Sequence, residues 1–335
     1  MQISELRKER VFVSIFLFLV CLVMARAVHA GWFETATNTR LHPPPVGTPY
    51  TPLFDRPSHL PDAYRVLMPA LGRFVMKTFH IPDAPAVAAL FDFINGFGAC
   101  YLFYRVTVDA LSETRLAAAL FLAMIQFGLY YIVPWQRPET TPSALYLAIC
   151  LFSFTRLRTN SNWVFPIVTA TILQDFIRTD IPLVLGVSVM VLGSLPTAPK
   201  TFGSRRHMLL LGSALICLTV SAQAYLSYVR FPNLHRWPVD NQIVTLKTNL
   251  LNAHSLSSGL VALFPFVLFA IYIARTRPSL DASDRLIMIA SGLYLVVWLC
   301  AGHLSEIRIF VPFMIALSSV IAKVLGSAQT DDGIH

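Results

Sequence analysis

Apolar segments separated by short polar stretches run along most of the 335-residue chain. A helix that crosses a membrane needs about 20 consecutive apolar residues, and fewer where neighbouring helices cover it. Ten segments fit this pattern, the last three of them short: residues 11–28, 84–106, 116–133, 208–229, 256–273, 286–300, 309–325, 144–154, 163–173 and 181–195. The pattern predicts an all-α, polytopic transmembrane helical bundle of about 10 spans, or about 8 if the last two short segments form a re-entrant hairpin.

A long segment between the first two predicted spans is assigned to the outer side of the membrane. Its last part, residues 62–79, repeats apolar side chains at helical spacing, whereas Arg65, Arg73 and Lys77 lie off that apolar face. This pattern is typical of a helix lying in the membrane interface. The chain is expected to form one membrane domain, residues 1–335, made of a first span at 11–28, an outer loop with a surface helix at 31–83, a helical bundle at 84–325 and a cytoplasmic tail at 326–335.

Basic residues indicate the orientation, because Lys and Arg in short connections resist translocation. With the N-terminus inside, the inner connections hold most of them, and the short outer connections hold only Arg137, Arg178 and Arg308. Both termini are therefore predicted to be cytoplasmic, in a bacterial inner membrane. Residues 28–30 resemble a signal-peptidase site, but the length of the preceding apolar run favours an uncleaved first helix.

Composition supports the membrane interpretation. Charged residues make up 13% of the chain and hydrophobic residues 55%, whereas soluble domains carry about 25% charged residues. The net charge of +8 is attributed to topology and anionic lipid, because no basic run interleaved with aromatic residues lies away from the membrane flanks, as a nucleic-acid site requires. The five cysteines lie in apolar segments without metal-site spacing, so neither a disulfide nor a metal site is predicted.

Ionisable side chains gather on the predicted outer side, where they favour an outward-facing site. In the outer loop, Asp55, Asp62 and Arg65 combine a possible base with a group that could hold a lipid phosphate. The alternative is a solvated loop in which Asp62 caps the surface helix. The charged segment at 303–312 contributes His303, Glu306 and Arg308, which either bind a diphosphate or sugar or attach this turn to the first loop.

Asp175 and Arg178 lie in a tight outer turn between two short apolar segments. We predict that they bind substrate, with Arg178 as a phosphate ligand. Because they are one helical turn apart, an internal ion pair between them is the alternative. Asp92 lies within the second predicted span, on one face with Asn95, and would be the coupling site of a proton-coupled carrier.

The layout resembles the GT-C class of glycosyltransferases, which use polyprenyl-phosphate-linked sugars. The shared features are a short inner N-terminus, one span, a long outer loop with acidic residues and a surface helix, and many spans with charged outer turns. Residues 64–69 and 306–312 are also similar to segments of uncharacterised bacterial membrane proteins grouped near that class.

The resemblance implies inverting sugar transfer at the outer face, with Asp55, or Asp62 instead, as the general base. Arg65, Arg178 and Arg308 would hold the lipid phosphate. Some members of the class use a divalent metal, but the first loop lacks an Asp-x-Asp pair, so no cofactor is predicted. The expected function is envelope-glycan assembly, with membrane lipid and a lipid-linked sugar as partners. An O-antigen-type polymerase or ligase, a proton-coupled transporter and a non-enzymatic membrane subunit are the alternatives.

Overall fold

The computed structural model describes residues 3–41, 66–107, 116–124, 139–157, 159–195, 204–232, 239–276, 278, 280–302 and 309–331, and every regular element in these ranges is helical. The elements, in chain order, are α1 (Ile3–Leu41), α2 (Leu67–Phe79), α3 (Ala84–Thr107), α5 (Thr140–Arg156), η3 (Ser161–Trp163), α6 (Val164–Asp175), α7 (Asp180–Ser194), α8 (Arg205–Ala224), η5 (Tyr225–Arg230), α9 (Val239–Leu251), α10 (Ala253–Thr276), α11 (Ala282–Ala301) and α12 (Val311–Asp331). Residues 116–124 are helical as well.

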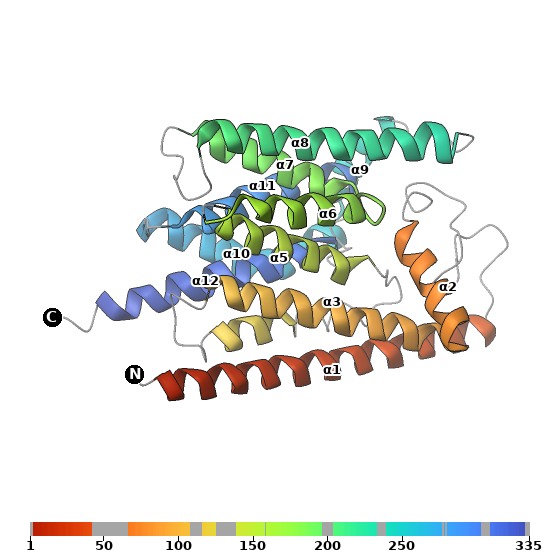
Figure 1. Cartoon of the computed structure of the whole chain (residues 1–335). Coiled ribbons are helices and arrows are strands. Elements are labelled where there is room, and N and C mark those ends of the chain that lie inside the picture. Colours follow the sequence, from red (N-terminus) through yellow and green to blue (C-terminus); the bar gives the residue numbers. More distant parts are fainter. Residues whose placement is uncertain are drawn as a thin grey trace.

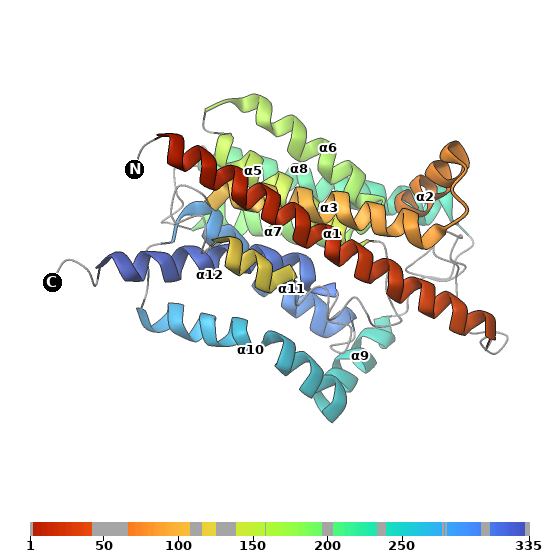
Figure 2. The same ribbon diagram turned by 90° about the horizontal axis from the view of Figure 1, so that it is seen from below.

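Most helices run roughly along one direction and so define two ends of a bundle (Figure 1). At one end, called here the termini end, α1 begins and α12 ends. At the other, called here the turn end, lie α2 and the turn from Phe176 to Thr179 between α6 and α7. Seen from below, α9 and α10 lie along one side of the bundle, away from α6 and α8 (Figure 2). The start of the first helix and the end of the last therefore lie at the same end.

Within the residues that the structure describes, four helices are long and apolar enough to cross a membrane: Arg10–Ala27, Ala86–Thr107, Arg205–Arg230 and Ala282–Cys300. Asp180–Ser194, Phe266–Thr276 and Val311–Val324 are apolar but shorter. The helical class and the membrane-type helices predicted from the sequence are thus confirmed. The span count of about 10 and the cytoplasmic placement of the termini stay predictions.

The first helix is longer than its apolar segment. The sequence predicts a loop from residue 31, but α1 continues to Leu41. Residues 31–41 are partly polar yet contain no proline, and the first proline, Pro43, comes two residues beyond the helix. Because proline lacks the backbone N–H that a helix interior needs and disfavours helical backbone in the residue before it, the helix has no strong stop signal before that point.

Glycines bring α7 and α8 close together. A Cβ atom on Gly212 would lie 2.8 Å from the backbone oxygen of Gly186 and 2.6 Å from Cγ of Met190. Small residues at such positions let membrane helices approach closely and pack backbone against backbone. This contact packs the middle of α8 against α7.

Candidate functional site at the turn end

Arg178 forms a buried ion pair at the start of α7. Its Nε donates to Asp180 Oδ1 at 3.1 Å, and its Nη2 donates to Asp180 Oδ2 at 2.5 Å and to the hydroxyl of Tyr294 on α11. That hydroxyl in turn donates to Asp180 Oδ2 at 2.8 Å. Burial alone would lower the pKa of Arg178, but the charge of Asp180 outweighs it and raises the pKa, so the guanidinium stays charged.

This triad replaces the ion pair between Asp175 and Arg178 that helical spacing suggested. As that alternative supposed, Arg178 does form an ion pair with a carboxylate, but the partner is Asp180, which belongs to the next helix. A phosphate group could therefore reach the guanidinium only by displacing Asp180, or by joining it from the exposed side of that carboxylate, whose side chain is 33% exposed.

Asp175 ends α6 in a different environment. Its side chain is 1% exposed, and among the described residues neither carboxylate oxygen has a hydrogen-bond partner. Burial raises the pKa of Asp175 to about 7, although the nearby hydroxyl of Thr219 on α8 counters part of the shift. Thr219 is itself buried, and its hydroxyl likewise makes no hydrogen bond within the described ranges.

The neighbouring Gln174 ties the turn to α5. Its Nε2 donates to Ser143 Oγ at 2.8 Å and to the backbone oxygen of Arg178 at 3.4 Å. Ser143 Oγ then donates to the backbone oxygen of Glu139 at 2.7 Å. These bonds fix the end of α6 against the first turn of α5, so the charged turn is held by its neighbours and not only by its own backbone.

A polar row on α8 faces the other side of the turn. Thr179 Oγ1 donates to Gln223 Oε1 at 3.2 Å, and Gln223 Nε2 donates to Ser227 Oγ at 3.1 Å. Thr219 and Gln223 are spaced four apart and share one face of α8. Ser227 lies in the π-helix η5, Tyr225–Arg230, which continues α8 with a geometry that often occurs at functional sites.

The surface helix α2 is attached to the same turn. The backbone nitrogen of Leu67, its first residue, donates to the backbone oxygen of Phe176 at 3.1 Å. Met68 and Gly72 are buried, whereas Phe74 and Phe79 are 63% and 66% exposed. Exposed apolar side chains on one face are what a helix in the membrane interface requires, and such a helix was predicted from the sequence pattern.

Asp92 forms a separate buried contact between α3 and α5. It is 7% exposed, and its Oδ1 accepts a hydrogen bond of 2.6 Å from Thr141 Oγ1. Asn95, predicted on the same face, donates instead to the backbone oxygen of Phe91 on its own helix. Asn249 on α9 donates to the backbone oxygens of Leu299 and Gly302 and so holds the end of α11.

Of the eight predicted site residues, Asp175 and Arg178 are described, and both lie at the α6–α7 turn. The other six lie outside the described residues and stay predictions: Asp55, Asp62, Arg65, His303, Glu306 and Arg308. The described residues that follow Arg65 and Arg308 in the chain lie at the turn end. Leu67 contacts the turn itself, and the ring of Phe310 stacks on Tyr294 with centroids 6.1 Å apart.

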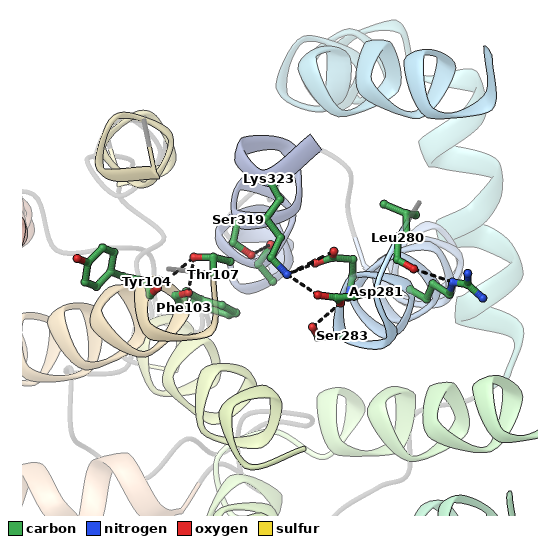
Figure 3. A network of polar contacts seen from close by, with 11 residues as sticks. Phe103, Tyr104, Thr107, Leu280, Asp281, Ser283, Ser319 and Lys323 are labelled. Carbon is green, nitrogen blue, oxygen red and sulfur yellow. Dashed lines mark hydrogen bonds and ion pairs between the residues drawn. The ribbon is translucent and has the colours of Figure 1, made fainter. Parts of the chain in front are cut away.

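A second buried polar cluster lies at the termini end (Figure 3). Lys323 on α12 donates to Asp281 Oδ2 at 2.6 Å and to Asp284 Oδ1 at 3.1 Å. Asp281 caps α11 by accepting from the backbone nitrogen of Asp284 and from Ser283 Oγ. Burial raises the pKa of Asp281, but the bonds from Lys323 and Ser283 outweigh this and lower it overall.

Comparisons with protein-family models, with curated proteins and with solved structures find no match to this chain. Within the ranges described, no group of three or more His, Cys, Asp or Glu side chains is placed to hold a metal ion. Functional inference therefore rests on the residues of the chain itself.

Proposed function

We propose that this protein is a membrane-embedded glycosyltransferase that takes its sugar from a polyprenyl-phosphate carrier at the turn end of the bundle. The observation that supports this best is the attachment of α2 to the charged turn through Leu67 and Phe176. A helix in the membrane interface lies at the depth of lipid phosphates. A charged turn bonded to that helix is thus suitably placed for a lipid-linked substrate.

The roles follow from the chemistry of the transfer. An acceptor hydroxyl needs a base, for which Asp55, or Asp62 instead, is the candidate, while Arg65 and Arg308 would hold the phosphate. Arg178 would join them when phosphate competes with Asp180 for its guanidinium. Without phosphate, its bonds to Asp180 and Tyr294 keep the charge satisfied.

The test is sugar transfer by the full chain in lipid nanodiscs, with radiolabelled polyprenyl-phosphate-glucose, -galactose or -arabinose as donors. Wild-type protein is expected to release the lipid phosphate and transfer the label to an added glycan acceptor. Asp55→Asn should abolish transfer, and Asp83→Asn, an outer carboxylate bonded to His29 and to the start of α3, is the matched control. If transfer persists in both Asp55→Asn and Asp62→Asn, neither residue is the general base. If no donor supports turnover by the wild-type protein, the proposal is contradicted.

A second candidate, proton-coupled transport, is favoured by the buried contact between Asp92 and Thr141. An intramembrane carboxylate is costly and commonly serves proton or ion movement. Transport predicts that Asp92→Asn stops function while Asp55→Asn and Asp62→Asn leave it intact. The transferase predicts the reverse order of sensitivity, so the three variants separate the two functions.

A further inference from the structure

The carboxylate of Asp175 is enclosed without the partners that an ionised group requires. It is 1% exposed, and its two oxygens meet no hydrogen-bond donor in the described part of the chain. An ionised carboxylate in such surroundings is strongly disfavoured unless a cation or several donors compensate it. The carboxyl group of Asp175 must therefore either be compensated by neighbouring groups or carry a proton.

The groups around Asp175 do not supply that compensation. Tyr146 on α5 lies close enough to interact with it electrostatically but brings no positive charge, and neither does the neighbouring Cys150. At the turn, Arg178 is engaged by Asp180 and Tyr294, and Glu139 adds a further negative charge near Arg178. From α8 comes only the hydroxyl of Thr219.

We propose that Asp175 is a buried proton-binding site, whose carboxyl group is neutral while the proton is bound and accepts a hydrogen bond from the hydroxyl of Thr219 when the proton is released. One bound proton removes the buried negative charge, which a single hydroxyl donor such as Thr219 would balance only in part. The pKa of about 7 at Asp175, raised by burial, places proton release near physiological pH. The site requires neither a sugar donor nor the loop carboxylates, so it does not rest on the proposed function.

Infrared titration of the full chain in lipid nanodiscs tests the site. Between about pH 5 and about pH 9, the wild-type protein should lose a carbonyl-stretch band of a protonated carboxyl group whose midpoint lies near neutrality. Asp175→Asn should remove that band. Asp281→Asn is the matched control, because it also deletes a carboxyl group, one whose pKa is lowered by the bonds from Lys323 and Ser283, and it should leave the titrating band in place.

Thr219→Val provides a second variant that keeps the carboxyl group. Since the hydroxyl counters part of the burial effect, its removal should move the midpoint to higher pH. If Asp175→Asn fails to fold, Asp175→Glu replaces it and should shift the band. A titrating band that is unchanged in both Asp175 variants would overturn the proposal. So would a wild-type titration that depends on Na⁺ in place of choline, because the ligand would then be a metal cation.

Discussion

Removing the ammonium of Lys323 would leave two carboxylates of α11 close together without a counter-charge. The Nζ atom lies 2.6 Å from Asp281 Oδ2 and 3.1 Å from Asp284 Oδ1. The side chains of Lys323 and Asp284 are only 10% and 7% exposed, whereas that of Asp281 is 52% exposed. The two ion pairs should therefore differ in strength.

The exposure determines the magnitude. Breaking a buried ion pair by deleting one partner costs about 3–5 kcal/mol, because the other charge stays buried. Water screens the half-exposed pair with Asp281, which should add at most about 1 kcal/mol. We therefore expect Lys323→Met to lower the free energy of unfolding by about 3 kcal/mol, mostly through Asp284.

Equilibrium unfolding in mixed detergent micelles measures this effect. Lys247→Met is the matched control, because Lys247 is exposed on α9 and should contribute less than about 0.5 kcal/mol. Adding Asp284→Asn to Lys323→Met should recover most of the loss, since the uncompensated buried charge is then gone. The reasoning is refuted if Lys323→Met is no worse than Lys247→Met, or if the second substitution recovers nothing.

Three further predictions concern the turn end and the helix contacts. The folded-state pKa of Asp175, about 7, lies above the ordinary 3.8, so the native state binds the extra proton. As pH rises between these two pKa values, the protein should lose at most about 4 kcal/mol of its free energy of unfolding, and its melting temperature should fall accordingly. Asp175→Asn should flatten this pH profile. Gly212→Ala forces a Cβ into the α7–α8 contact and should cost about 1–3 kcal/mol, whereas Gly292→Ala, with nothing within 4 Å of the new atom, should not destabilise. Tyr294→Phe removes the hydrogen bond to Asp180 and should cost about 1–3 kcal/mol by the same unfolding measurement.

The sequence predicted helix positions well where apolar runs end at charged residues. The span expected at 84–106 is α3, Ala84–Thr107, and the segment at 286–300 lies within α11, Ala282–Ala301. Hydropathy carries this information because a span must match the thickness of the hydrocarbon layer. Hydropathy does not show that the partly polar residues 31–41 are helical. The lack of proline in this segment was the one sequence feature consistent with a longer α1.

The partner of Arg178 could not be predicted from spacing alone. The rule that residues three apart face each other applies inside a helix, but α6 ends at Asp175 and the chain turns before Arg178. Arg178 therefore reaches forward to Asp180 in the first turn of α7. Tyr294 was also missed as a member of the site, because α11 is apolar on most faces and its rotation is set by tertiary packing.

Polar contacts hold α11 at two levels of the bundle. Near its start Asp284 binds Lys323, and ten residues later, about 15 Å along the axis, Tyr294 binds Arg178 and Asp180. In lipid, apolar packing alone gives little drive for helix association, so such polar contacts have a large share in fixing the position and rotation of a helix. Tyr294→Phe should therefore loosen α11 at the second level. It should leave proton binding at Asp175 intact, because within the described ranges the Asp175 carboxylate bonds to neither Arg178 nor Tyr294, and a lost titration in that variant would show that the two cannot be separated.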